Sequence, residues 1–417
     1  MNDTPMFLSD AETQQVQRDF GTPTFVYDEA AIRRRVAEAL AYPNAYGLTV
    51  RYAMKACPTR AILRTLHQAG LHIDASSGYE AERAMKADIP GEHIQLTAQE
   101  LPKNLGELLD AGVLFNACSL HQLRAYGELR PHSEVSVRMN PGLGSGHSNR
   151  TNVGGPSSSF GIWHEHLDDI EAIRREYDLR ITRMHTHIGS GADPETWNRC
   201  AQLSLAIAGQ LPDVTLLSLG GGFKVGRMPD EATADLQSIG QIIKADLEAF
   251  ATEHGRKLHL EIEPGSFFLV NSGLLVCTII DVVDTGEEGY AFLKVDAGMT
   301  EITRPSLYGA QHPLHVVPVM PGERGSQDYL VVGHCCESGD VLTPEPGNPE
   351  GLQTRNLTEA RIGDLLVVSG AGAYCASMCT KNYNSFPEAA EVMRQADGSF
   401  ACIRRRQTLD QSIQNEL

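Results

Sequence analysis

The sequence lacks any uninterrupted apolar run approaching the roughly 20 residues of a membrane-spanning helix, which argues against an integral membrane protein. Met1–Ser9 has neither a basic nor an apolar segment, so we expect no signal peptide and a cytoplasmic protein. Low-complexity stretches are missing too, and 41% of the 417 residues are hydrophobic. A large folded core, rather than global disorder, follows from that composition.

Basic residues are few compared with acidic ones: the chain has 35 Lys and Arg but 53 Asp and Glu, which gives a formal charge of −18. Such a surface repels nucleic acid and anionic membranes, so we expect neither as a partner, although a local basic pocket for a small anion is compatible with it. The nine cysteines are odd in number and scattered, which is typical of reduced thiols rather than a disulfide framework.

Familiar ligand motifs are absent as well. The His-Cys-Cys run at 334–336, with Cys375 and Cys379, does not have the spacing of a zinc site, and we expect no metal. No Walker loop is present, and the glycine-rich stretch 142–146 lacks the G-x-G-x-x-G form. The sequence therefore favours neither a nucleotide nor a dinucleotide ligand.

Short apolar runs alternate with helical segments over the first two thirds of the chain. Candidate strands cover 50–57, 71–77, 93–98, 114–119, 135–141, 180–189, 215–222 and 257–265, and helical periodicity covers 59–69, 79–87, 164–177, 194–210 and 232–254. Eight β/α units in about 250 residues predict an α/β TIM barrel. Periodicity alone leaves a doubly wound open sheet as the alternative.

Beyond residue 265 the runs become strand-like and are separated by Gly, Pro and acidic turns. They cover 274–283, 290–295, 328–332, 364–369 and 399–405. This pattern predicts a β-rich sandwich or small barrel, which the early segment 25–28 could join. The Pro- and Gly-rich segment 343–351 indicates a surface loop. We assign residues 26–268 to the barrel, and residues 1–25 and 269–417 to the β-rich domain.

Polar side chains gather at the carboxyl ends of the predicted barrel strands, where TIM barrels place their active sites. They include Lys55, Asp74, Ser76, Ser77, Arg138, Asn140, His185, His187, Glu261 and Glu263. Core filling alone would favour Val, Ile or Leu there, so the coincidence across these five strands, with the glycines 220–222 at the end of a sixth, indicates a functional site. Three glycines at 220–222 could bring backbone N–H groups to a phosphate, or form a plain flexible turn.

Three of these side chains suit particular chemistry. Lys55 could be a desolvated amine with a lowered pKa that forms a Schiff base, or a lysine that merely extends into solvent. Glu263 could hold a proton on a ring nitrogen, or be a surface carboxylate at a strand end. His187 offers a flat ring for stacking, whereas its alternation with His185 would also suit a metal that lacks an obvious third ligand.

Taken together, the motifs resemble those of fold-type III pyridoxal-phosphate (PLP) decarboxylases over nearly the whole chain. The matching segments are 52–57, 74–80, 185–190, 220–223, 263–265, 304–310, 336–340, 372–374, 382–385 and 403–408. The resemblance implies a TIM barrel with a β domain, bound pyridoxal 5'-phosphate and, in the branch it most resembles, decarboxylation of meso-2,6-diaminopimelate to L-lysine. The alternatives are another amino-acid decarboxylase, acting on ornithine, lysine or a specialised substrate, and a catalytically dead regulatory homologue.

The resemblance also assigns roles by position. Lys55 would bind PLP covalently, His187 would stack on its ring, and Glu263 would pair with the pyridine nitrogen, which keeps the ring an electron sink. The phosphate would be bound by Ser190, Gly220, Gly221, Gly222, Gly265, Ser266 and Tyr374.

The β-rich domain would supply most of the substrate contacts. Arg304 and Tyr308 resemble a clamp for a distal carboxylate, because a guanidinium meets a carboxylate with two parallel hydrogen bonds. Cys336 would donate a proton to the carbon that loses CO2, and Glu337 would bind the distal amine. Both would come from the partner subunit, which implies a homodimer with shared active sites. The substrate would be bound by Ser266, Arg304, Tyr308, Glu337 and Tyr374.

Three positions depart from the family pattern. Ser266 stands where Arg usually follows Glu-Pro-Gly, Ser159 stands where Lys is usual, and Phe386 stands where Arg is usual. The loss of two or three cations near a dianionic pocket leaves the preferred substrate open between diaminopimelate and another amino acid.

Overall fold

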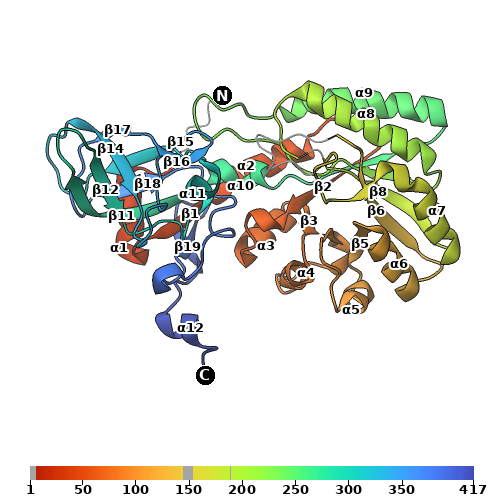
Figure 1. Ribbon diagram of the computed structural model, residues 1–417, viewed down its shortest axis with the longest axis horizontal. Helices are drawn as coiled ribbons and strands as arrows, with labels where there is room; N and C mark the ends of the chain where they lie inside the picture. The colour runs from red at the N-terminus through yellow and green to blue at the C-terminus, as the bar shows by residue number, and fades with distance from the viewer. Residues whose placement is uncertain (1–5, 144–153, 188) are drawn as a thin grey trace. The chain divides into compact units, whose positions relative to one another are not determined.

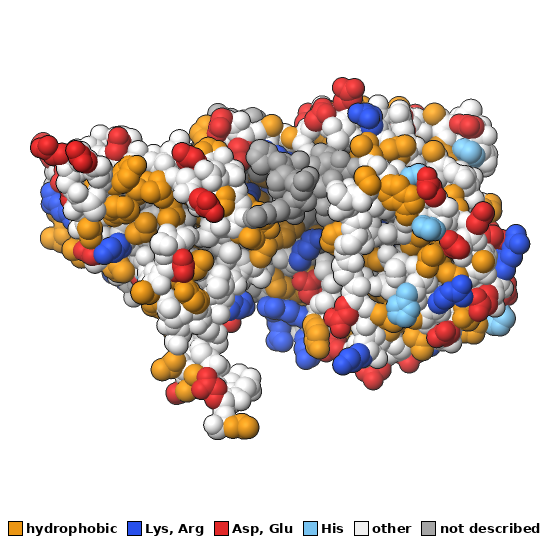
Figure 2. Space-filling view, viewed as in Figure 1, with side chains coloured by type: hydrophobic (Ala, Val, Ile, Leu, Met, Phe, Trp, Pro, Cys, Tyr) orange, Lys and Arg blue, Asp and Glu red, His pale blue; other side chains and the backbone are white. Residues whose placement is uncertain are grey.

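The computed structural model describes residues 6–143, 154–187 and 189–417, and the chain divides into two compact units (Figure 1). The barrel unit comprises residues 33–225 and 232–267, and the β unit comprises residues 1–32, 226–231 and 268–417. Among the described residues, no helix has the length and apolar character needed to cross a bilayer. On the face shown in Figure 2, acidic and basic side chains are interspersed over both units.

Eight parallel strands close the barrel. They are β2 (Leu48–Ala53), β3 (His72–Ala75), β4 (Ile94–Leu96), β5 (Leu114–Ala117), β6 (Glu134–Asn140), β8 (Arg180–His185), β9 (Leu216–Ser218) and β10 (His259–Ile262). Pairing of β2 with β10 and of β5 with β6 completes the ring, while β7 (Ile162–Trp163) adds to β6 outside it. The TIM barrel prediction is therefore confirmed, and the open sheet is excluded.

Helices cover the outside of the barrel strands (Figure 1). They are α3 (Arg60–Gln68), α4 (Gly78–Met85), α5 (Leu105–Asp110), α6 (Leu120–Leu129), α7 (Leu167–Glu176), α8 (Pro194–Gln210) and α9 (Leu236–His254), and α2 (Glu29–Leu40) precedes them. The cap residues set their starts. Asp235 accepts hydrogen bonds from the backbone N–H groups of Gln237 and Ser238, so α9 begins four residues after the predicted 232.

Several barrel strands end earlier than predicted. Lys55, Ser76, His187 and Glu263 follow the strand ends, whereas Asp74, Arg138, Asn140, His185 and Glu261 lie within the last residues of their strands. The run 50–57 is a strand only to Ala53, after which η1 (Met54–Ala56) carries Lys55. The run 215–222 ends at Ser218, because Gly220 and Gly222 adopt φ angles of +68° and +104° that interrupt an extended strand. The candidate residues therefore lie at the rim of the barrel, where their side chains can converge.

The β unit is built on one nine-stranded sheet. Its strands are β1 (Thr24–Asp28), β11 (Gly273–Asp284), β12 (Ala291–Val295), β13 (Leu314–Val317), β14 (Ser326–Val332), β17 (Arg355–Thr358), β18 (Leu365–Val368), β19 (Ala390–Arg394) and β20 (Phe400–Arg404). β1 lies between β11, with which it is antiparallel, and β19, with which it is parallel. The expectation that segment 25–28 joins the second domain's sheet is confirmed.

The core of the β unit is aliphatic and includes one early helix. Val26, Leu274, Val276 and Val367 are fully buried together with Val16 of α1 (Asp10–Phe20). The surface-loop prediction for 343–351 is wrong, because β15 (Pro344–Glu345) and β16 (Asn348–Leu352) pair as a small hairpin. Short helices complete the chain: α10 (Ser266–Leu269), α11 (Arg304–Tyr308) and α12 (Leu409–Ile413).

Candidate active site

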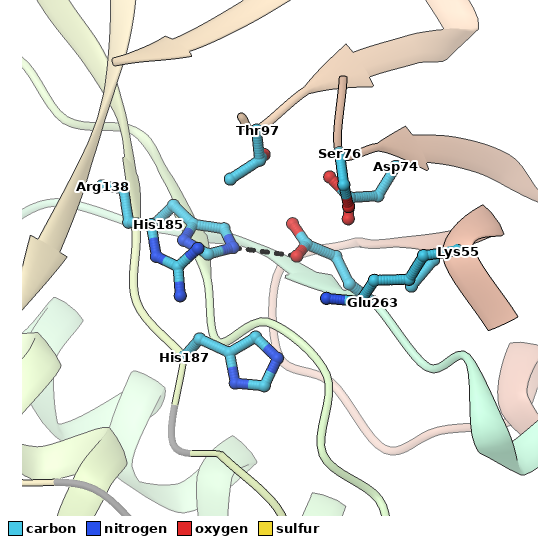
Figure 3. Close-up of a pocket in the computed structure, with 9 residues that line it drawn as sticks. Lys55, Asp74, Ser76, Thr97, Arg138, His185, His187 and Glu263 are labelled. Carbon is cyan, nitrogen blue, oxygen red and sulfur yellow. Dashed lines mark hydrogen bonds and ion pairs between the residues drawn. The ribbon is translucent and has the colours of Figure 1, made fainter. Parts of the chain in front are cut away.

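A small polar cavity opens at the carboxyl ends of the barrel strands (Figure 3). It is lined by Ala53, Lys55, Asp74, Ser76, Thr97, Arg138, His185, His187 and Glu263. Most of these residues are the strand-end residues that the sequence singles out, and they come from widely separated parts of the chain. In Figure 3 the amine of Lys55, the carboxylate of Glu263 and the two histidine rings turn toward the same space.

Glu263 is the hub of a buried hydrogen-bond network. Nε2 of His185 lies 2.8 Å from its Oε2, while Nε2 of Gln95 and Oγ of Ser218 each donate to its Oε1 over 2.9 Å. Burial alone would raise the pKa of Glu263, but the adjacent His185, through its charge and hydrogen bond, and then Ser218 outweigh burial and lower it. The carboxyl is therefore ionised and oriented, as a partner for a protonated ring nitrogen must be.

A second layer of charge lies beneath the cavity and is connected to Glu263 through Gln95. Nη2 of Arg183 donates to Oε1 of Gln95 over 2.8 Å and to Oε2 of Glu261 over 2.6 Å. Nη2 of Arg51 donates to the other oxygen of Glu261 over 2.8 Å, and both of these side chains are fully buried. Because the Gln95 oxygen is engaged by Arg183, the amide can present only its N–H group to Glu263.

Asp74 lines the same cavity in the opposite protonation state. Burial raises its pKa well above the usual range, the negative charge of Glu263 raises it further, and Lys55 opposes both effects. The two carboxyl groups of this site therefore differ in protonation, with the acid form at Asp74 and the anion at Glu263. Acid–base chemistry requires such a pair. This residue was named from its strand-end position alone, without a role.

His187 and Lys55 face the cavity with different environments. Burial, and next the charge of Arg138, keep the pKa of His187 well below its usual value. Its Nδ1 accepts a hydrogen bond from the Gly189 N–H over 2.9 Å, so the ring is a neutral plane of fixed orientation. Lys55 lies on η1, where it is exposed and lines the cavity, and its charge acts on Asp74 and His187. A desolvated amine at this position stays a prediction.

The glycines at 220–222 form a tightly packed turn against His187. A Cβ atom at Gly221 would lie 2.4 Å from the carbonyl oxygen of Glu263, and one at Gly220 would lie 2.7 Å from the carbonyl oxygen of Thr186. At Gly222 the clash would be with the Gly189 oxygen, also at 2.4 Å. Side chains are therefore excluded from this turn, and packing requires the three glycines where a flexible turn would not.

The remaining predicted site residues fall in two groups. Ser190, Gly265 and Ser266 belong to the barrel unit, where Ser266 begins α10. Arg304, Tyr308, Cys336, Glu337 and Tyr374 belong to the β unit. There Arg304 lies over the Tyr308 ring at 5.8 Å from its centroid, Tyr374 adopts a positive φ of +57°, and the side chains of Cys336 and Glu337 are exposed.

The two other departures from the family pattern have partners of their own. Ser159 accepts a hydrogen bond from Nε2 of Gln99 over 3.3 Å at the barrel surface. Phe386 stacks on His334, with ring centroids 3.6 Å apart and planes inclined by 7°. An uncharged residue is thus locally accommodated at both positions.

Sequence reasoning missed Thr97, which lines the cavity, and Gln95 and Ser218, which donate hydrogen bonds to Glu263. Gln95 and Thr97 stand two residues apart in the predicted strand 93–98, so alternation places them on the same face. Polar residues at that spacing in an otherwise apolar barrel strand are a usable signal, because a polar group buried in a barrel requires a partner. They were overlooked because neither carries a charge.

The cavity fits the PLP that the sequence motifs imply. It offers a lysine amine for the aldehyde, an ionised carboxylate for the pyridine nitrogen and a flat neutral imidazole for the ring face. The glycine turn 220–222 packs against that imidazole. The orphaned Oδ1 of Asp74 and Nδ1 of His185, both buried without a partner in the structure, are polar atoms that a bound group could engage.

Comparisons with known proteins agree with this geometry. The family model described as pyridoxal-dependent decarboxylase, pyridoxal binding domain, matches residues 29–270. The chain is 35% identical to diaminopimelate decarboxylases of Streptomyces coelicolor, over 96% of this chain and 90% of that one, and of Escherichia coli K12, over 96% and 94%. A crystal structure of diaminopimelate decarboxylase superimposes with a TM-score of 0.91 at 33% identity, covering 100% of this chain and 98% of the other.

Proposed function

Because the chain belongs to the pyridoxal-dependent decarboxylase family, we propose that it converts meso-2,6-diaminopimelate to L-lysine and CO2 with pyridoxal 5'-phosphate as cofactor. The observation that carries the chemistry is the buried, ionised Glu263 beside Lys55 and His187. The substrate is supported by relatives of that activity at 30–35% identity over nearly the full chain.

The barrel residues prepare the site for bond cleavage. Lys55 would hold the cofactor covalently, His187 would stack on the ring, and the glycines at 220–222 would bind its phosphate. Glu263 keeps a proton on the ring nitrogen by a charge-assisted hydrogen bond. The chemistry that bound PLP would supply is an electron sink for the pair left when the bond to the departing carboxylate breaks. His185, Gln95 and Ser218 keep Glu263 ionised while this happens.

The β unit is proposed to bind the part of the substrate that does not react. Arg304 and Tyr308 hold the distal carboxylate, Glu337 holds the distal amine, and Cys336 gives its thiol proton to the carbon that has lost CO2. Cys336 is exposed, and its backbone N–H donates to Oδ1 of Asn384 over 2.8 Å, which fixes the loop that presents the thiol. We propose that Cys336 and Glu337 act in the active site of the partner subunit of a homodimer.

The substrate is tested by measuring CO2 release from meso-, LL- and DD-diaminopimelate, D- and L-lysine, and ornithine. We expect the meso isomer to be used with the highest kcat/KM and to yield L-lysine. Faster turnover of ornithine or lysine would move the chain to another branch of the family. Release of CO2 from none of the six compounds, with PLP bound, would identify a catalytically dead homologue.

The shared site is tested by mixing two inactive variants, Lys55→Ala and Cys336→Ala. A hybrid dimer contains one site with both residues intact, so activity should return toward a quarter of the wild-type value when subunits exchange randomly, because half the dimers are hybrids with one of two sites intact. Exchange is verified first with tagged subunits. Hybrids that demonstrably form and stay inactive would show that Cys336 does not act across the interface.

A further inference from the structure

Arg227 and Arg304 are neighbouring cations in the β unit. Arg227 comes from segment 226–231, and Arg304 is the first residue of α11. Each of them acts electrostatically on the buried His312 and on Cys375, and Arg304 acts on Arg227 as a like charge. Nothing in the sequence gives a reason to select Arg227, and it has no role in the mechanism proposed for the barrel residues.

Neither guanidinium has a carboxylate partner among the residues that the structure describes. Nε of Arg227 donates to the carbonyl oxygen of Gly370 over 3.0 Å, whereas its Nη2 is buried without a partner. Nε of Arg304 is also buried without a partner. Buried unpaired donors are costly, and two of them on adjacent cations point to an acceptor that is not part of this unit.

The position of Arg227 is fixed by its surroundings. The backbone N–H groups of Arg227 and Met228 both donate to Oε2 of Glu231, over 2.6 and 3.3 Å, so this acid caps the turn and does not form an ion pair with the guanidinium. Gly370 packs against the side chain, since a Cβ atom there would lie 3.0 Å from Cγ of Arg227. The guanidinium is thus held in place before any ligand arrives.

The neighbours leave the positive charge of the pair largely uncompensated. Burial, followed by the charge of Arg304, lowers the pKa of Arg227 to about 9, so this side chain is still protonated at pH 7. Burial and then the two arginines hold the pKa of His312 well below its usual value, and burial raises the pKa of the Cys375 thiol, so both are neutral. Glu231 is the acid that attracts Arg227, and its oxygen is engaged by the backbone.

We propose that Arg227 joins Arg304 in binding the carboxylate that the substrate retains, which makes Arg227 a specificity-determining residue. The identity of this ligand rests on the proposed function, in which the distal carboxylate of diaminopimelate becomes the carboxylate of L-lysine. Two guanidinium groups supply donors for both carboxylate oxygens. When an amino acid with a single carboxylate places that group at the reacting end, the two cations face each other without an anion, so the pair selects against the decarboxylation of ornithine and D-lysine.

The test compares two probes that differ only in this carboxylate, L-lysine and cadaverine. Their binding to the holoenzyme is followed by the change in absorbance of the bound cofactor, for wild type, Arg227→Met, Arg227→Lys and the control Arg361→Met. Arg361 is an exposed arginine of the same unit, so its replacement changes the net charge equally. We expect Arg227→Met to weaken L-lysine binding about 10- to 100-fold and cadaverine binding less than twofold.

The remaining outcomes separate this inference from the proposed function. Equal losses for both probes, or no loss for either, would overturn the role of Arg227. If Arg227→Met does not fold, as judged by its melting temperature, Arg227→Lys decides, because it keeps the charge but loses the planar fork and should weaken L-lysine selectively by a smaller factor. A third outcome is that the wild-type enzyme does not decarboxylate diaminopimelate, while Arg227→Met still loses the preference for L-lysine over cadaverine. That result would refute the proposed function and support the arginine pair.

Discussion

Replacing Gln95 by Met should weaken the catalytic centre although Gln95 does not itself line the cavity. The Gln95 amide donates to Oε1 of Glu263 over 2.9 Å while its oxygen accepts from Nη2 of Arg183 over 2.8 Å. Methionine has a similar length and no donor. Glu263 then keeps His185 and Ser218, and Arg183 keeps Glu261, so the barrel should still fold.

The size of the effect follows from the charge on the acceptor. A hydrogen bond to a charged group contributes about 1.5–3 kcal/mol, so losing the Gln95 donor should raise the pKa of Glu263. The ring nitrogen of the cofactor would then be held less firmly in its protonated form. We expect kcat/KM to fall about 10- to 100-fold, and stability to fall by about 1–3 kcal/mol because Arg183 loses one acceptor.

The assay combines kcat/KM, the dissociation constant of PLP and the pH dependence of the cofactor absorbance. A purely structural defect would leave the pH dependence of the absorbance unchanged. Gln68→Met, at an exposed position of α3, is the matched control. Gln95→Glu should be worse than Gln95→Met, because a second carboxylate would repel Glu263. Wild-type PLP affinity, pH dependence and kcat/KM in Gln95→Met would refute the argument that this amide positions Glu263.

Other expectations concern the cofactor anchor and the β unit. Borohydride reduction should fix PLP to the peptide containing Lys55, identified by mass spectrometry, and label on any other lysine would contradict this assignment. Burial raises the pKa of Glu301 from 4.5 to about 7, so between those pH values the folded state holds a proton that the unfolded chain has released, and this contribution to stability is lost as pH rises toward 7. We therefore expect the free energy of unfolding in urea of Glu301→Gln, relative to that of the wild type, to increase by about 3 kcal/mol between pH 4.5 and pH 8. A difference that does not change with pH would contradict the buried acid.

Periodicity predicted the architecture well because a barrel repeats one unit eight times. The helix 194–210 was located to the residue, since Asp193 and Pro194 form a strong start signal. Strand ends were less accurate, because apolar character continues through Met54 into η1 and hides the turn that presents Lys55. The hairpin at 343–351 was missed because Pro and Gly in a short strand pair look like loop residues.

The site could be predicted where charge marks it. Lys55, His187 and Glu263 stand out at strand ends, whereas Gln95 acquires its importance only from tertiary hydrogen bonds to Glu263 and Arg183. Arg227 is a second residue whose neighbours could not be predicted from the sequence. The serine at position 266 suggested a missing cation, but a lone arginine in an unremarkable loop gives no sign that it lies beside Arg304. Residue type could be read from the sequence, while the pairing of distant residues required the fold.

The position of β1 in the sheet of the β unit has a consequence for how the protein is made. Phe25 emerges from the ribosome early, yet its neighbours in the sheet are Leu275 and Glu391, which are among the later residues synthesised. The barrel strands are contiguous in the sequence between β1 and these partners, so the barrel can close before the partners of β1 are synthesised. Until then β1 is unpaired, although every one of its residues is buried in the finished sheet. A chain released before β19 keeps a bare apolar strand edge, and such unfinished chains should aggregate or need a chaperone until the last strands arrive.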